Sequence, residues 1–346
     1  MHEYFGADKP FKTTEEQIDI LRKRGLEIND EKLANSFLLS KNYHILINSY
    51  KPPFTYLDSN DDEMFQPGTS FEDLVRFYYF DETLRNILFN YIISFERSFN
   101  IAMSDALSQS FGVSMNRYLR KENFKNRHGK VKSVLKEIWK IRKSKYNPTK
   151  HYRETKNHIP FWVLSQNMTF GQIRMFYSIL NVKEKEFIVS QIFNLQINSL
   201  NSQDKESLKK LLKKILTIIL GYRNNLAHGG NLVTYRSDST FSQNDAASHE
   251  YRLTKADVRL LWPKGIATNS TWDKNKLGRN DTYCLLICIM SGLSSHYFDQ
   301  RNFAFELENN FFNRYKDLPN FGLYLKSVGL PEDLDRYLNN FINPIK

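Results

Sequence analysis

The chain has 346 residues, enough for one large domain or two small ones, and 41% of them are hydrophobic and 25% charged. This composition excludes a largely disordered chain. The net charge of +11 indicates a polyanionic partner, and nucleic acid is the first to consider. The sequence contains no Gly-rich phosphate loop and no cluster of metal ligands, so we expect neither a cofactor nor a metal.

The N-terminus is polar and acidic, unlike a signal peptide, and no apolar run is long enough to span a bilayer. Cys284 and Cys288 lie four residues apart in an apolar stretch, where we expect two buried free thiols on one helix face. These features predict a cytoplasmic protein in a reducing compartment, with no membrane partner.

Helix signals open the chain. Residues 13–24 begin with a threonine cap and acidic residues, and a second short helix is expected over 30–39. Residues 57–68 are acidic and resemble a loop. We therefore expect a helical N-terminal appendage at 1–56 and a main helical domain at 57–346.

Two helices are expected after this loop. Ser70 opens a capping-box pattern ahead of FEDLVRFYYF. Asp81 is expected to cap the next helix, in which apolar residues recur at three- and four-residue steps up to a stop at Gly112. A further helix is expected over 131–145, with an apolar stripe and a separate lysine stripe.

Pro148 and Pro160 are expected to bracket a loop. The stretch HIPFWVLSQNMTFGQIRMFYSIL predicts a pair of helices that is interrupted near 169–171. Residues 207–222 (SLKKLLKKILTIILGY) predict a strong helix that is capped by Ser207.

The pattern changes at 231–253, where Val, Thr, Tyr and Ser alternate with polar residues. This stretch predicts either a small β-hairpin or an ordered loop insertion. Helices are expected again near 280–300, 301–316 and 331–342. The chain as a whole therefore predicts an all-α fold.

The excess charge lies in one segment, 117–156, where 15 Lys and Arg face three Glu and give +12. The rest of the chain, with 34 basic and 35 acidic residues, carries −1. A concentrated basic segment can hold several phosphates, and its interleaved aromatic residues could stack on unpaired bases. The alternative is a solvated helix face over core aromatics. The residues predicted to bind RNA are Arg120, Lys121, Lys125, Arg127, Lys132, Lys136, Lys140 and Lys143, together with Lys209 and Lys213 of the later helix.

The clearest local motif is LGYRNNLAHGG, in which Arg223 and His228 form an R-x4-H arrangement with Asn224 directly after the arginine. Histidine suits the proton transfers of metal-independent RNA cleavage, and the planar fork of arginine suits the phosphate. Asn224 would position the arginine or contact the phosphate. On a helix Arg223 and His228 would lie about 140° apart around the axis, since each residue turns it by about 100°.

The R-x4-H spacing alone is a weak signal, because a basic chain matches it by chance. Arg153 and His158 repeat it in HYRETKNHIP. Glu154 beside this arginine and the flanking prolines favour a structural histidine there rather than a second catalytic pair.

The order of the segments around the first motif resembles the Abi_2 family of abortive-infection proteins, which includes AbiD and AbiF. Four segments follow one another over roughly residues 13–300: the opening helices with YHILINSYKPPF, the block SFEDLVRFYYFDETLRNILFNYIISFERSFN, the HIPFW…FG segment, and RNNLAHGG. The sequence departs from the family at Gly229 and Gly230, where relatives often carry a bulky or basic residue after the motif histidine.

This resemblance implies an all-helical HEPN fold, a metal-independent endoribonuclease, and bacterial defence against phage by growth arrest or cell death. It places Arg223, Asn224 and His228 in the HEPN R-x4-6-H motif as catalytic residues. Two such motifs usually meet across a dimer in this superfamily, so the single copy predicts a homodimer. The resemblance also implies a bound small structured noncoding RNA, which we place on 117–156.

Two other functions stay open at this point. A non-catalytic protein in complex with a structured noncoding RNA would use the same basic segment without cleaving RNA. A DNA-binding regulator would use residues 13–39 as a helix-turn-helix, although the spacing of that segment is loose.

Overall fold

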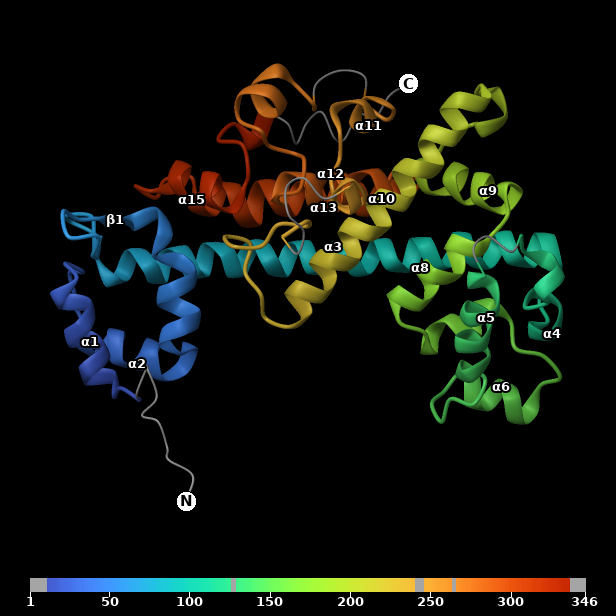
Figure 1. The fold of residues 1–346 in the computed structure, drawn as a ribbon, viewed down its shortest axis with the longest axis horizontal. Helices are drawn as coiled ribbons and strands as arrows, with labels where there is room; N and C mark the ends of the chain where they lie inside the picture. Colours follow the sequence, from blue (N-terminus) through green and yellow to red (C-terminus); the bar gives the residue numbers. More distant parts are fainter. Residues whose placement is uncertain (1–10, 126–128, 240–245, 263–265, 337–346) are drawn as a thin grey trace.

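The computed structural model describes residues 11–125, 129–239, 246–262 and 266–336. It confirms the all-α class: helices dominate, and the sheet in the described part of the chain has two short strands. Figure 1 shows one long helix, α3, running horizontally through the molecule with other helices packed along it. No helix among the described residues is long and apolar enough to cross a membrane.

Helix α3 spans Phe71–Phe111, and its 41 residues make it the axis of the fold. Ser70 caps it in a capping box with Asp73, and Gly112 ends it, as the sequence predicts. The prediction that Asp81 caps a separate helix is wrong, because Asp81 lies inside the continuous α3 with its side chain fully buried. A capping aspartate accepts a hydrogen bond from the next helical turn, whereas Asp81 accepts hydrogen bonds from Tyr50 and Leu232, which are distant in the chain.

Helices α9 (Val182–Phe193), α10 (Ser202–Ala227) and α12 (Thr282–Gly292) pack against α3 and enclose the core. Every residue of α12 is buried, including the free thiols Cys284 and Cys288, as the sequence predicts. Gly292 faces the ring of Phe95 so closely that a Cβ there would clash with it.

Helix α10 begins earlier than the sequence predicts. Its cap is Asn201, which accepts a hydrogen bond from Asp204 N, and Ser207 lies within the helix. The helix then continues through Arg223 to Ala227, so the candidate motif occupies its last turns.

The N-terminal region holds α1 (Thr14–Lys23) and α2 (Glu31–Lys41), close to the predicted bounds. The strands β1 (Thr55–Leu57) and β2 (Glu63–Phe65) pair antiparallel and form the sheet of the described structure. The acidic stretch at 57–68 therefore belongs partly to a hairpin. The predicted boundary between 56 and 57 falls inside β1, and the division into an appendage and a main domain stays a prediction. Two short helical segments link α2 to the hairpin, the π-helix η1 (His44–Asn48) and the 3-10 helix η2 (Pro52–Phe54).

The basic segment folds at the far end of α3 from this region, as Figure 1 shows. Helix α5 (Lys130–Ile141) buries its predicted apolar face, and it packs on α8 (Phe170–Ile179). The stretch between Pro148 and Pro160 contains a helix, α6 (Thr149–Thr155), so the prediction of a plain loop there is wrong. The remaining elements of this end are α4 (Met115–Tyr118), η3 (Lys121–Asn123), α7 (Phe161–Leu164) and η4 (Ser165–Asn167).

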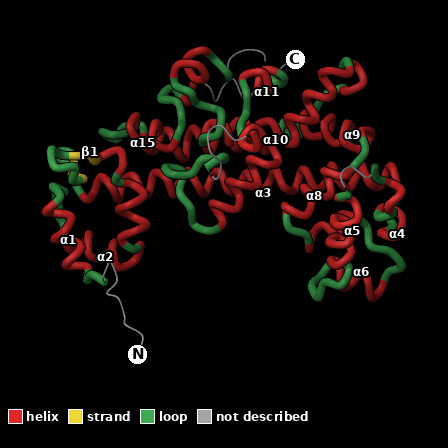
Figure 2. Tube along the Cα trace, in the orientation of Figure 1, coloured by secondary structure: helices red, strands yellow, loops and turns green. Residues whose placement is uncertain are grey.

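The residues at 231–253 take the loop form of the prediction. Their described part consists of turns and a 3-10 segment, η6 (Ala246–Tyr251), without a strand, and Figure 2 draws the turns beyond α10 as loop. Helix α15 (Phe321–Val328) was not predicted, and the helix predicted at 331–342 lies partly outside the described residues. The other elements are η5 (Ile197–Ser199), α11 (Lys255–Arg259), η7 (Asn269–Lys274), α13 (Tyr297–Phe305), η8 (Glu306–Phe312) and α14 (Asn313–Tyr315).

Candidate functional site

The end of α10 is built by the two glycines that follow the motif histidine. Gly229 has a φ of 76°, in the left-handed region that favours glycine. Its N–H donates to Leu226 O at 3.1 Å, and the N–H of Gly230 donates to Asn225 O at 2.9 Å. This pattern is a Schellman motif, so His228 is the helix cap and the helix stays intact up to it.

An open pocket of about 450 Å³ adjoins this helix end. That volume lies within the range of small-molecule sites and would admit a nucleotide. Asn224 and His228 are one helical turn apart and both line it, and both are exposed. The other lining residues of the pocket come from the chain after α10 and are Tyr235, Ser237, Ser239 and Tyr251.

Arg223 does not line this pocket; it faces α3 instead. Its Nε atom lies 3.3 Å from Oε1 of Glu96, and 34% of the Arg223 side chain is exposed. Burial raises the pKa of the Glu96 carboxyl, and the nearby guanidinium opposes that rise. Glu96 therefore holds the candidate catalytic arginine from a second helix.

Glu96 was not among the residues predicted from the sequence, although a signal is present. Glu96 is an acidic residue directly beside the apolar stripe of α3, between the buried Phe95 and the buried Ser98 and Phe99. A partly buried carboxylate needs a cationic partner, but the sequence does not indicate which arginine supplies it.

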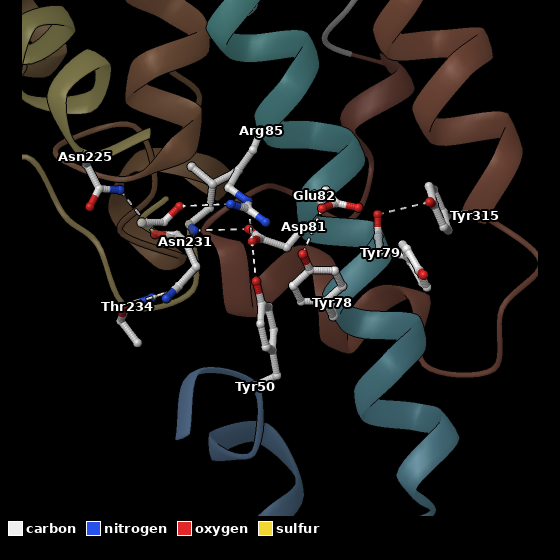
Figure 3. A network of polar contacts seen from close by, with 12 residues as sticks. Tyr50, Tyr78, Tyr79, Asp81, Glu82, Arg85, Asn225, Asn231, Thr234 and Tyr315 are labelled. Carbon is white, nitrogen blue, oxygen red and sulfur yellow. Dashed lines mark hydrogen bonds and ion pairs between the residues drawn. The ribbon is translucent and has the colours of Figure 1, made fainter. Parts of the chain in front are cut away.

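A buried polar network ties the loop after the motif to α3, as Figure 3 shows. Asp81 accepts hydrogen bonds from Tyr50 Oη at 2.6 Å and from Leu232 N at 3.0 Å. Its other contact is an ion pair with Arg85 Nε at 2.8 Å, and Arg85 Nη1 donates to Gly230 O at 3.2 Å. The backbone that follows His228, at Gly230 and Leu232, is thus anchored to α3.

Burial raises the pKa of Asp81, while Arg85, Tyr50 and the backbone of Leu232 favour the ionised form. Burial and the neighbouring Asp81 also raise the pKa of Tyr50 far above its ordinary value, so the tyrosine remains a donor at physiological pH. The network joins the N-terminal region, α3 and the candidate site in one connected unit.

The basic segment is almost free of neutralising acids. In the part of the chain that the structure describes, 12 of its 14 Lys and Arg have no ion pair, and the exceptions are Lys140 with Glu137 and Arg153 with Glu154. Seven of the residues predicted to bind RNA are exposed there: Arg120, Lys121, Lys125, Lys132, Lys136, Lys140 and Lys143. Arg127 lies outside the described residues.

The two lysines of α10 that were predicted to bind RNA differ from this set. Lys209 contacts Glu186 and Glu206 at 3.3 and 3.1 Å and is 12% exposed, and Lys213 pairs with Glu250. Carboxylates thus compete with RNA for these two ammonium groups. Their role in RNA binding stays a prediction.

Four aromatic residues of the basic segment fall into two groups. Tyr118 and Phe124 are buried in the core, and Tyr118 Oη donates to Ile159 O at 2.9 Å. Tyr146 is 76% exposed, and Trp139 is partly exposed with the guanidinium of Arg142 near its ring. Base stacking is therefore sterically open at Tyr146 and closed at the two core rings.

The fold and the site define an all-α protein with an exposed histidine and asparagine at the end of a helix and an unneutralised basic surface. The family model of Abi-like proteins (Abi_2) matches residues 36–234, which is more than half of the chain. The chain therefore belongs to the Abi-like family, and this membership indicates a role in abortive infection. No curated protein and no solved structure matches it.

The matched region contains α3, the basic segment and all of α10 with its terminal motif. It ends at Thr234, within the loop that Asp81 anchors. No group of three or more metal-ligating side chains occurs among the described residues.

Proposed function

We propose that this chain is a metal-independent endoribonuclease of the HEPN superfamily that acts in abortive infection, close to AbiD and AbiF. The observation that carries the proposal is the exposed pair of His228 and Asn224 in a nucleotide-sized pocket, with Arg223 held by Glu96 on the adjoining face. The basic segment supplies the surface that binds RNA.

In the proposed reaction the ribose 2′-oxygen attacks the phosphorus and the bond from phosphorus to the 5′-oxygen breaks. The products are a 2′,3′-cyclic phosphate and a 5′-hydroxyl. His228 transfers a proton from the attacking hydroxyl or to the leaving oxygen. Arg223 stabilises the charge of the phosphorane, and Asn224 hydrogen-bonds to a phosphate oxygen or orients the strand.

The reaction needs both a base and an acid, whereas the chain offers one histidine in the pocket. A homodimer with its two α10 ends facing each other would supply both, one His228 from each copy. The dimer would also bring Arg223 of one copy toward His228 of the other. The two residues could then act on the same phosphate, although they point in different directions on a single helix. We therefore propose a dimeric active site.

The proposal predicts that purified protein cuts RNA in the presence of EDTA and leaves 2′,3′-cyclic phosphate ends. His228→Ala should remove the cleavage and also the growth arrest caused by expression. The matched control is His249→Ala, which removes another exposed histidine that does not line the pocket. Cleavage that persists in His228→Ala, or that is lost equally in the control, contradicts the assignment.

The alternative is a non-catalytic protein that binds a structured small noncoding RNA. The unpaired cations of the basic segment favour RNA binding independently of the pocket. This alternative predicts that wild type and His228→Ala bind RNA equally and that neither cuts it, with or without phage infection of the host.

A further inference from the structure

A second and smaller pocket lies inside the basic segment, between the start of α4, the end of α5 and the residues after α6. Its polar lining consists of Ser114, Asn116, Arg142, Arg153, Lys156 and His158, with Asn157. The pocket thus contains Arg153 and His158, the R-x4-H pair for which the sequence favours a structural role.

Two of these side chains are fixed in place. Arg153 Nη1 donates to the carbonyl oxygens of Arg142 at 2.8 Å and Ser144 at 2.7 Å, which satisfies acceptors at the end of α5. Nδ1 of His158 lies 2.7 Å from Asn157 Oδ1, and its ring packs edge-on against Tyr152. The fixed geometry means that little conformational entropy remains to be lost when an anion binds.

The charge of the pocket is not balanced by the protein. Arg142 and Lys156 have no carboxylate partner within the described ranges of the chain, and both are exposed. Glu154 pairs with Arg153 at 3.2 Å but does not line the pocket. Arg142 and Lys156 thus bring two unbalanced positive charges to the pocket, which favours the binding of a compact anion.

The size of the pocket narrows the choice of anion. Its volume of about 40 Å³ would hold roughly three water-sized spheres of 10–15 Å³. That space suits the oxygens of one phosphate group and is too small for a base or a ribose. A phosphate monoester fits better than a backbone phosphate, because a terminal phosphate group has a charge of about −1.5 to −2. A backbone phosphate has a charge of −1 and is joined to a nucleoside on both sides.

We propose that this pocket binds the terminal phosphate monoester of an RNA strand. The proposal rests on the proposed function in that the chain binds RNA, but it does not depend on cleavage. Arg142 and Lys156 supply the charge, and the fixed Arg153 and His158 shape the pocket. Asn116 donates a hydrogen bond to a phosphate oxygen.

The test measures binding by fluorescence anisotropy in the full-length His228→Ala protein, so that cleavage does not interfere. One RNA sequence is compared with a 5′-hydroxyl, a 5′-phosphate and a 3′-phosphate end. We expect one phosphorylated end to bind about tenfold more tightly than the 5′-hydroxyl form, which corresponds to about 1.4 kcal/mol. The additional change Arg142→Ala with Lys156→Ala should abolish this preference.

The matched control is Lys132→Ala with Lys136→Ala, which removes the same charge from exposed positions of α5 outside the pocket. It should weaken all three RNAs alike and keep the preference. Equal binding of the three RNAs by the parent protein overturns the proposal, and so does a preference that survives the loss of Arg142 and Lys156.

A second measurement separates this proposal from RNA binding itself. Inorganic phosphate is titrated while the imidazole signals of His158 are followed by NMR, with sodium chloride at equal ionic strength as the reference. A saturable shift in wild type that is lost in the double variant Arg142→Ala with Lys156→Ala supports a phosphate pocket. This holds even if the protein binds no RNA, and the absence of RNA binding would contradict the proposed function alone. No phosphate-specific shift overturns the pocket.

Discussion

At the scale of single residues, the candidate site depends on a carboxylate that the motif does not contain. Glu96 lies on α3 and faces Arg223, so the arginine is oriented across a helix interface rather than by its neighbours in the chain. Such positioning matters for catalysis, because a displacement of about 1 Å can cost on the order of a hundredfold in rate.

Glu96→Gln should therefore lower the turnover number for RNA cleavage roughly ten- to a hundredfold, with a smaller change in KM. The amide keeps the size of the side chain and removes the charge that holds Arg223. Single-turnover cleavage assays measure the effect, and Glu308→Gln, an exposed acid elsewhere, is the control. An unchanged rate would show that Arg223 needs no partner on α3.

A second residue makes stability depend on pH. Asp281 caps the buried helix α12 and accepts hydrogen bonds from Gly278 N and Cys284 N, yet burial raises its pKa to about 6. An acid with a raised pKa binds its proton more tightly in the folded state. The contribution of Asp281 to the free energy of unfolding is therefore fully present below its pKa in the unfolded chain, about 4. It is lost as the pH rises through the folded-state pKa of about 6.

Asp281→Asn should remove this dependence, since the amide oxygen still accepts the capping hydrogen bonds. Relative to wild type, the variant should gain up to about 3 kcal/mol between pH 4 and 7, at about 1.4 kcal/mol per pKa unit. Urea unfolding of both proteins across this range measures the difference. A constant difference at every pH would show that Asp281 titrates at its ordinary value.

At the scale of elements, local patterns predicted most helices, and long-range contacts account for the misses. Thr13 and Ser70 act as predicted because a cap involves only the next turn. Asp81 carries the same local signal, but its partners, Tyr50 and Leu232, are distant in the chain. The motif and the angle between Arg223 and His228 could be found from the sequence, whereas Glu96 as the partner of Arg223 could not, because it lies on a different helix.

The network at Asp81 links the N-terminal region and the loop after α10 to α3. Asp81→Ala should lower the free energy of unfolding by about 3–5 kcal/mol, because Arg85 is left buried without its counter-ion, with 15% of its side chain exposed. The control is Glu137→Ala, which breaks the exposed pair with Lys140 and should cost no more than about 1 kcal/mol. Denaturant unfolding monitored by circular dichroism measures both, and equal losses would contradict a special role for the network.

At the scale of the whole molecule, charge is segregated to one end. The basic segment lies beyond the C-terminal end of α3, and the N-terminal helices lie at the other end, as Figure 1 shows. The sequence was sufficient to locate this segment because charge is counted along the chain. It did not show that the segment folds as one end of the molecule, which is a property of the long helix.

This segregation predicts a salt dependence that a few substitutions control. RNA affinity should fall linearly with salt on logarithmic axes, and Lys132→Ala with Lys136→Ala should reduce the slope by about 1.4, or about 0.7 per phosphate contact of a single strand. Lys316→Ala with Lys326→Ala removes the same charge outside the segment and should leave the slope unchanged. Equal slopes for all three proteins would place the RNA elsewhere.

Because α3 is unbroken, it sets the distance between Arg223 and the basic segment. Arg223 of α10 contacts α3 at Glu96, and the basic segment begins after Phe111, where α3 ends. Fifteen residues of helix cover about 22 Å at about 1.5 Å each. A stacked strand rises roughly 3.4 Å per nucleotide, so under the proposed function about seven nucleotides would cover this length. We therefore predict that shorter oligonucleotides reach either the basic segment or Arg223, but not both.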